Sequence, residues 1–276
     1  MADDYRTLQI TKADGVATVQ LSNAPINLLD ETLMGEIRRF LDRVRSDPGV
    51  RVIIFESRDP DFFLAHVDMT LGTRPEAVAE LTAFASEALN PFQAFAEALR
   101  AQPQVTIVKL KGLARGGGAE FVAAADMAFA AEQTAGLAQC EALMGIIPGG
   151  GATQYLPARM TRGRALEVVL GAALFDARTA ERYGWINRAL PTDTLDAFVD
   201  TLARNIAALP SEIVAAAKAA IGQADHAAGF LRETAGWAGL AFRPDTADLM
   251  AAQLRSGAQT REGERDLEGL LRQVQG

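Results

Sequence analysis

The chain has 276 residues, and its 27 Lys plus Arg against 35 Asp plus Glu give a formal net charge of −8. This length can bury a substantial core, as one large domain or as one domain with a small appendage. Two histidines and one cysteine exclude a disulfide scaffold and a zinc site built from His and Cys alone, and they favour a reducing, cytoplasmic compartment. The acidic charge argues against a nucleic-acid partner, and no apolar run is long enough to span a membrane.

The first part of the chain predicts strands and helices in alternation. Residues 5–22 alternate in the manner of two strands around the turn Ala13-Asp14-Gly15, which indicates a β-hairpin. Asp30 is expected to cap a helix whose apolar residues recur at helical spacing. Residues 51–55 form a nearly continuous apolar run that is typical of a buried strand, and a loop from Ser57 to Asp68 is expected after it.

The alternation continues through the middle of the chain. A helical stretch is predicted over residues 75–100, a buried strand over 105–110, a helix of small residues ending near Ala125, and a strand over 127–130. This order of strand, helix, strand and helix is typical of an α/β fold.

From about residue 161 onward the pattern is helical, and no strand is expected there. Helix starts are predicted at Asp176, Asp193, Pro210 and Asp245. We therefore divide the chain near residue 195, into an α/β core of residues 1–195 and a helical part of residues 196–276. Helices without a sheet of their own need a partner surface, which is either the core or another subunit.

Three consecutive glycines, Gly116 to Gly118, separate the 105–110 strand from the helix that follows. Glycines allow close approach of a ligand, and the start of a helix offers unpaired N–H donors, so this turn suits a phosphate or a developing oxyanion. The alternative is that the glycines only let the helix pack tightly against a sheet. The spacing matches neither the dinucleotide-binding motif nor a P-loop.

Two glutamates follow these glycines. Glu120 lies in the first turn of the predicted helix, and Glu141 lies among apolar and small residues, where burial would raise the pKa of its carboxyl. Two carboxyls in different environments are typical of acid–base chemistry. The structural alternatives are a charge that complements the helix dipole for Glu120 and an exposed loop position for Glu141.

Three further residues are candidates with weaker support. His66 is either a catalytic base or a structural histidine, and Asp68 is a candidate cap for a helix beginning at Met69. Cys140 is either a nucleophile or part of a wall of small residues beside Glu141. No nucleophile-elbow motif supports serine-hydrolase chemistry.

Several motifs occur together, in order and at a familiar spacing. Residues 111–126 read KGLARGGGAEFVAAAD, which resembles the glycine-rich signature of the crotonase (enoyl-CoA hydratase/isomerase) superfamily. Residues 139–154 read QCEALMGIIPGGGATQ, which resembles the second signature of that family. AHVD at 65–68 stands where the family usually has Ala-Gly-Ala-Asp, and APIN at 24–27 resembles its first turn. With a similar segment at 171–191, the resemblance covers about residues 5–195.

The resemblance implies a spiral of ββα units, followed by helices that build a homotrimer or a dimer of trimers. It implies an acyl-CoA ligand whose thioester oxygen is held by two backbone N–H groups, which by motif belong to Val67 and Gly117. No metal is implied, and no cofactor beyond the CoA of the substrate itself. The resemblance places seven other residues at the substrate: Ala24, Ile26, Ala65, His66, Asp68, Gly116 and Cys140. At His66 and Cys140 the sequence departs from the family.

In the hydratases of this family, two glutamates bind a water between them, and the second supplies the proton to Cα. Glu120 and Glu141 occupy those two positions, so the resemblance implies an enoyl-CoA hydratase that adds water across a 2,3-unsaturated acyl-CoA. Three alternatives stay open. These are an isomerase that uses Glu141 alone, an acyl-CoA thioester hydrolase with the same oxyanion site, and a non-catalytic member that binds acyl-CoA or RNA.

Overall fold

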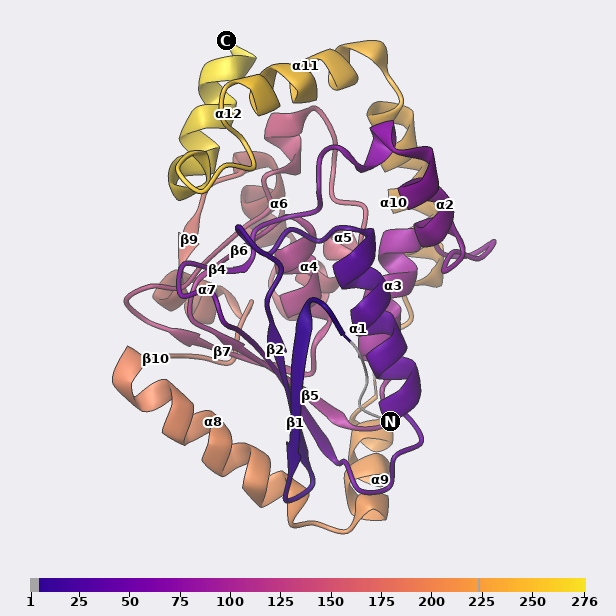
Figure 1. The fold of residues 1–276 in the computed structure, drawn as a ribbon, viewed down its shortest axis with the longest axis vertical. Coiled ribbons are helices and arrows are strands. Elements are labelled where there is room, and N and C mark those ends of the chain that lie inside the picture. Colours follow the sequence, from indigo (N-terminus) through magenta and orange to yellow (C-terminus); the bar gives the residue numbers. More distant parts are fainter. Residues whose placement is uncertain (1–4, 223) are drawn as a thin grey trace.

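A computed structural model describes residues 5–222 and 224–276 of the chain. It is an α/β fold built around two mixed sheets (Figure 1). The larger sheet has six strands, in the order β1 (Leu8–Ala13), β2 (Val16–Leu21), β3 (Val52–Ser57), β5 (Val105–Leu110), β7 (Met127–Ala131) and β10 (Arg188–Leu190). The smaller sheet has four, in the order β4 (Phe62–Leu64), β6 (Leu113–Arg115), β8 (Gly136–Ala138) and β9 (Phe175–Asp176).

From β3 to β8, successive strands of the chain alternate between the two sheets. Each turn of the chain contributes one strand to the larger sheet and the next strand to the smaller one, as in β3 then β4, β5 then β6, and β7 then β8. The strands of successive turns pair in parallel within each sheet. This is the spiral of ββα units that the motifs implied, and the hairpin predicted over residues 5–22 is the antiparallel pair β1–β2.

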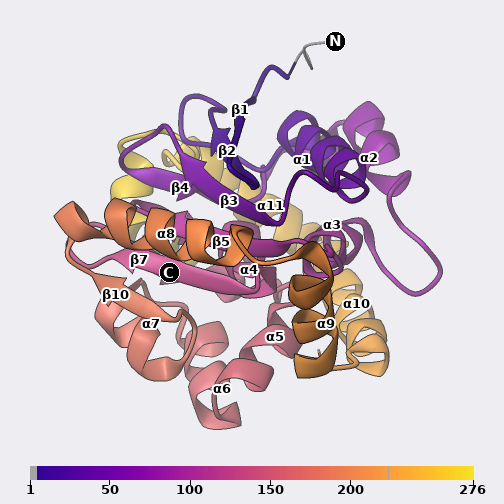
Figure 2. The same ribbon diagram turned by 90° about the horizontal axis from the view of Figure 1, so that it is seen from below.

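Helices cover both faces of the larger sheet. On one face lie the mutually packed α1 (Glu31–Val44), α3 (Pro91–Arg100) and α4 (Gly117–Ala124), and α8 (Thr192–Ala207) crosses the other face against β3, β5 and β7 (Figure 2). The core between sheet and helices includes Phe55, whose ring meets those of Phe40 and Phe121 edge-on. Asp30 accepts a hydrogen bond from the Leu33 N–H at 2.8 Å, which confirms the predicted cap of α1.

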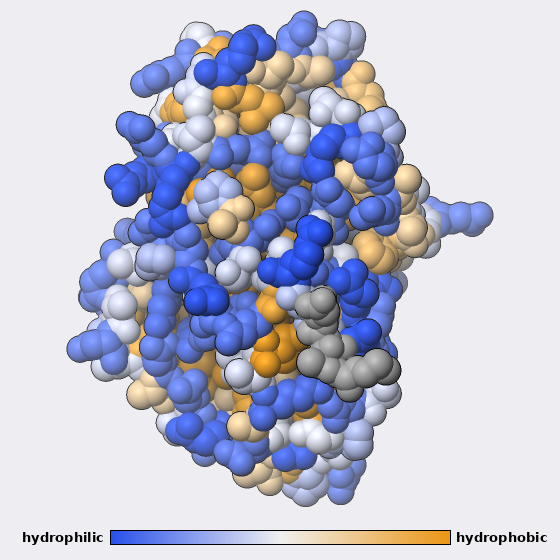
Figure 3. Space-filling model, viewed as in Figure 1, coloured by the Kyte–Doolittle hydropathy of each residue, from blue (hydrophilic) through white to orange (hydrophobic). Residues whose placement is uncertain are grey.

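The remaining helices lie around this core, and the last ones pack back over the smaller sheet at one end of the molecule (Figure 1). The face drawn in Figure 3 is largely hydrophilic, with separate apolar patches. The short and C-terminal helices are η1 (Leu71–Thr73), α2 (Pro75–Thr82), η2 (Glu141–Met144), α5 (Ala152–Arg159), α6 (Arg162–Gly171), α7 (Ala177–Tyr183), α9 (Ser211–Ile221), α10 (Ala227–Ala241), α11 (Pro244–Arg255), η3 (Gly263–Asp266) and α12 (Leu267–Gln275).

Several predictions about secondary structure were wrong. Strands β9 and β10 lie in the region expected to be only helical, and β4 lies in the expected loop. Strands of two or three residues are too short to show a period of two, so the sequence carries no signal for them. The predicted 75–100 helix is two helices, because Asn90 forms a capping box with Gln93 and starts α3 anew at Pro91.

Candidate functional site

The glycine turn brings the start of α4 against the segment after β4. Gly116 has a positive φ of 47°, which a side chain would strain. A Cβ atom on Gly117 would come 2.5 Å from Val67 Cγ2, and one on Gly118 would come 2.2 Å from the Leu64 carbonyl oxygen. The packing alternative is therefore correct for Gly118, whereas Gly117 places the first N–H of the helix beside Val67.

Two backbone N–H groups at this contact, those of Val67 and Gly117, have no backbone acceptor among the described residues. Leu29 and Val67 form an isolated parallel bridge, in which the Leu29 N–H donates to the His66 carbonyl at 2.9 Å and the Asp68 N–H donates to the Leu29 carbonyl at 3.1 Å. In such a bridge the Val67 N–H points away from Leu29. The Gly117 N–H begins α4 and has no acceptor within the helix. Together they resemble a pair of donors for an oxyanion.

Glu120 is buried at the start of α4 and is fixed by the loop before α5. Its Oε1 accepts hydrogen bonds from the Gly150 N–H at 2.8 Å and the Ala152 N–H at 3.0 Å. Burial raises the pKa of Glu120 well above its ordinary value, and the charges of Glu141 and Glu233 raise it further. This carboxyl therefore keeps its proton to a higher pH than an exposed glutamate does.

Glu141 begins η2 and is 7% exposed. The Gln139 amide, oriented with its nitrogen toward the carboxylate, donates to both Glu141 oxygens at 3.0 Å. Burial raises the pKa of Glu141 to about 7, with Glu233 raising it and His66 lowering it. The exposed-loop alternative is wrong for Glu141, and its carboxyl can gain or lose a proton near neutral pH.

A third carboxyl completes this acidic group. Glu233 lies on α10, 3% exposed, where its Oε1 accepts from Gln93 Nε2 at 3.0 Å and its Oε2 accepts from the Thr153 N–H at 3.1 Å. Burial raises the pKa of Glu233 despite these donors. Because Glu120, Glu141 and Glu233 influence one another, their protons belong to the group rather than to single residues.

His66 lies on the other side of the glycine turn in a buried charged cluster. Its Nδ1 is 2.7 Å from the Val67 carbonyl oxygen and its Nε2 is 3.0 Å from Glu264 Oε1. Arg115, fully buried on β6, donates to Glu268 through Nε at 2.7 Å and Nη2 at 3.1 Å, and to the Glu264 carbonyl at 3.0 Å. The His66 ring thus contacts Glu264 and Val67, which favours the structural alternative for His66 over the catalytic base.

Asp68 is fully engaged with protein donors. Its carboxylate accepts from Thr70, from Gln259 Nε2 at 2.9 Å and from Arg74 Nη2 at 2.6 Å. The predicted helix beginning at Met69 is instead the short turn η1, which starts at Leu71. Asp68 therefore fixes the 68–74 turn to the C-terminal segment.

The other expected substrate residues differ in exposure. Ala24 is exposed, whereas the side chains of Ile26 and Ala65 are buried together with Phe62. Cys140 is 1% exposed among apolar residues, and burial raises the pKa of its thiol well above the ordinary value. A thiol in this environment holds little thiolate, which argues against the nucleophile alternative and favours a packing role.

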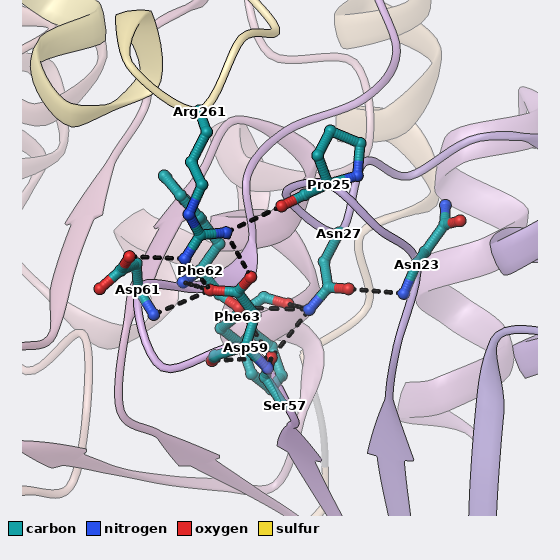
Figure 4. Close-up of polar contacts among 9 residues, drawn as sticks. All are labelled: Asn23, Pro25, Asn27, Ser57, Asp59, Asp61, Phe62, Phe63 and Arg261. Carbon is teal, nitrogen blue, oxygen red and sulfur yellow. Dashed lines mark hydrogen bonds and ion pairs between the residues drawn. The ribbon is translucent and has the colours of Figure 1, made fainter.

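A polar network holds the turn that carries Ala24 and Ile26 (Figure 4). Asn27 Nδ2 donates to Ser57 Oγ at 2.8 Å and to the Phe62 and Phe63 carbonyls at 3.2 Å, while its Oδ1 accepts from the Asn23 N–H at 2.7 Å. From the C-terminal segment, Arg261 donates to the Pro25 carbonyl at 2.9 Å and pairs with Asp59 and Asp61, above the Phe62 ring. The turn is thereby joined to both β4 and the C-terminus.

Sequence reasoning missed several residues that the structure brings to the site. Gln139 and Arg115 lie inside the two quoted motifs. Gln139 is two residues from Glu141 and Arg115 directly precedes Gly116, so their places in the motifs could have marked them as site residues. Glu233, Glu264 and Gln259 lie in helices and turns far along the chain, where no motif marks them. Among the described residues, no group of three or more His, Cys, Asp or Glu could hold a metal ion.

Comparison with known proteins agrees with this geometry. The family model described as enoyl-CoA hydratase/isomerase matches residues 11–231. The chain belongs to the enoyl-CoA hydratase/isomerase family. A crystal structure from Streptomyces avermitilis, provisionally described as an enoyl-CoA hydratase, is 57% identical to this family member, with a TM-score of 0.96 over 98% of this chain and 99% of the other.

More distant proteins are also similar to this chain. The probable enoyl-CoA hydratase echA8 of Mycobacterium bovis is 28% identical over 221 residues, which is 80% of this chain and 82% of that protein. An enoyl-CoA hydratase structure from Bacillus anthracis is 26% identical, with a TM-score of 0.70 over 91% of this chain and 96% of the other. None of the described helices is both long and apolar enough to cross a membrane.

Proposed function

We propose that this family member is an enoyl-CoA hydratase that adds water across the double bond of a 2,3-unsaturated acyl-CoA. The observation that carries the proposal is the pair of buried carboxyls, Glu120 and Glu141, behind the Gly116–Gly117 turn. The two have different surroundings, because Glu120 is held by two backbone N–H groups and Glu141 by the Gln139 amide. Such a pair can hold a proton on one member while the other is ionised.

The thioester oxygen is proposed to lie between the Val67 and Gly117 N–H groups. Addition at Cβ passes through an enolate, so negative charge grows on that oxygen during the reaction. Fixed donors at such an oxygen commonly contribute about 10²–10³ in rate for each donor. Glycine at 117 supports this role, because a side chain there would collide with Val67.

The two carboxyls are proposed to bind the reacting water between them. Glu120 Oε1 already accepts two N–H groups, so its proton is carried by Oε2, which can donate to the water oxygen. The Glu141 carboxylate accepts a proton from that water as the oxygen forms its bond to Cβ. Glu141 then delivers the same proton to Cα, which regenerates the carboxylate and completes the addition of one water molecule.

The test is turnover of purified protein with enoyl-CoA thioesters of graded length, followed by loss of the conjugated enoyl absorbance. Glu120→Gln and Glu141→Gln should each slow hydration by roughly 10²–10⁴. The hydratase proposal would be removed if the parent hydrated no thioester of the panel and if neither glutamine substitution changed how the protein behaves toward any acyl-CoA. Release of free CoA thiol would point to a thioester hydrolase, and a shifted double bond without hydration to an isomerase.

We propose as well that residues 1–195 form the acyl-CoA-binding core and that residues 196–276 contribute to a homotrimer or a dimer of trimers, in a cytoplasmic protein. Large apolar side chains stand exposed near the end of the core and on the C-terminal helices, and neighbouring subunits would cover them. Light scattering coupled to size exclusion tests the subunit number, and a monomer would contradict this proposal. The described residues of this kind on and near α6, α9 and α10 are Leu166, Leu170, Leu174, Leu209, Ile213, Ile221, Leu231 and Phe242.

A further inference from the structure

Four charged side chains meet in the interior where the C-terminal segment crosses the glycine turn. His66 and Glu264 form an ion pair at 3.0 Å with side chains 2% and 0% exposed. Arg115 pairs with Glu268 at 2.7 Å and lies 3.7 Å from Glu264. Two cations and two anions balance, which is the condition under which buried charges are tolerated.

The hydrogen bonds define the protonation state of the His66 ring. Nδ1 faces the Val67 carbonyl oxygen, which can only accept, and Nε2 faces an oxygen of the Glu264 carboxylate. With Glu264 ionised, both ring nitrogens donate, and an imidazole that donates twice is the cation. Burial lowers the pKa of His66, but Glu264 and the Val67 carbonyl outweigh burial and leave this pKa raised. For Glu264, burial raises the pKa, but His66 outweighs burial and leaves this pKa lowered.

This ring lies next to both halves of the proposed site. It is bonded to Val67, whose N–H is one of the two oxyanion donors. A Cβ atom placed on Gly116 would lie 3.6 Å from His66 Cβ and 3.1 Å from Glu141 Oε1, so both side chains border Gly116. The charged groups that face His66 are Glu264 from η3, Arg115 from β6 and Glu141 from η2.

We propose that the His66 imidazolium, held between the Glu264 carboxylate and the Val67 carbonyl, is a positioning residue that fixes Val67 through its carbonyl, across the Cα from the N–H at the thioester site, and supplies a positive charge near Glu141. The proposal rests on the acyl-CoA reaction proposed above. Through Glu264, the C-terminal segment becomes part of the site without contacting the substrate. Gln259 reinforces the link, because its amide bonds Asp68 and Met69 and its N–H donates to Glu264 at 2.9 Å.

The first test reads the ring directly and needs no turnover. The chain has two histidines, so ¹⁵N spectra of the imidazoles give two assignable sets of signals. His66 should keep the shifts of a doubly protonated ring to a pH above the ordinary range of a histidine, whereas His226, whose pKa is lowered by burial and Arg100, should be neutral there. A His66 ring that loses its proton at or below its ordinary range would overturn the proposal.

The second test separates positioning from packing. In His66→Gln, the glutamine keeps bulk and one hydrogen bond but loses the charge. The acid limb of kcat/KM should move to higher pH, because Glu141 loses the neighbouring cation, and kcat should fall by about tenfold or more with a smaller change in KM. His226→Gln, which alters a ring packed on Tyr155 and Phe230, should leave the profile unchanged.

A third readout stands if no substrate is turned over. Saturated butyryl-CoA labelled at the carbonyl should show a lowered C=O stretch on binding, because the Val67 and Gly117 N–H groups polarise that bond. The lowering should be smaller in His66→Gln and unchanged in His226→Gln. If His66→Gln folds and leaves both the stretch and the acid limb unmoved, His66 only packs and the proposal fails, whether or not hydration is the reaction.

Discussion

Gly117 and Val67 lie so close that a single methyl group on the glycine would come 2.5 Å from Val67 Cγ2. The contact has no room for a side chain at 117 unless Val67 moves, so the glycine lets the start of α4 pack directly against Val67. Loop and helix start are thus fitted to each other at the site where charge is proposed to develop.

Gly117→Ala should therefore raise the activation free energy of the reaction by more than it lowers the free energy of unfolding. Val67 must shift to admit the methyl group, and loss of one well-aimed donor costs roughly 10²–10³ in rate. Enzyme assays and thermal melts of the variant measure the two effects. Gly163→Ala is the matched control, since nothing lies within 4 Å of its added Cβ, and it should leave kcat unchanged. Equal rates in both variants would contradict the donor geometry.

Glu141→Gln should make the protein more stable while it slows the reaction. Folding raises the pKa of Glu141 from 4.5 to about 7, so its favourable contribution is complete below about pH 4.5 and is lost as the pH rises through 7. An amide avoids that loss, and the gain should grow over this interval to on the order of 1–3 kcal/mol above pH 7. Chemical denaturation at several pH values measures it. A constant difference across the range would show that ionisation of Glu141 is not its cause.

The pH dependence of hydration should show the same ionisation. Because Glu141 must be ionised to accept the proton of water, kcat/KM should rise with pH through about 7. At higher pH it should fall when Glu120 loses its proton, since the pKa of that carboxyl is raised well above 4.5. The residual activity of Glu141→Gln should lack the lower limb, and retention of that limb would assign it to another group.

Asn27→Ala should destabilise the protein through the first turn. The change removes the donor to Ser57, Phe62 and Phe63 and the acceptor of the Asn23 N–H, although Ser57 Oγ still bonds the Phe62 carbonyl, and it should cost about 2–4 kcal/mol. Asn27→Gly removes the same bonds but accepts the φ of 54° without strain, so it should be the less damaging of the two. Urea unfolding distinguishes them, and an alanine variant as stable as the parent would contradict the network.

The sequence predicted the parts of this molecule that are built locally. The hairpin, the Asp30 cap and the glycine turn are set by neighbouring residues, and two glutamates at motif spacing identified the centre of the site. Strands β9 and β10 escaped prediction because two or three residues have no measurable period. Glu233 and Glu264 escaped because they reach the site only through tertiary packing, from positions where a glutamate on a helix is ordinarily a solvated charge.

The buried cluster also indicates the order in which contacts form as the chain is synthesised and folds. His66 and Glu264 are 198 residues apart in the chain, and Arg115 and Glu268 are 153 apart. Contacts across such separations form late, because the loop they close must be ordered first. During synthesis the glycine turn leaves the ribosome long before the carboxylates that neutralise Arg115. Until they arrive, the nascent chain must leave that guanidinium and the His66 ring in water, so the buried cluster is complete only after the η3 and α12 segments have docked.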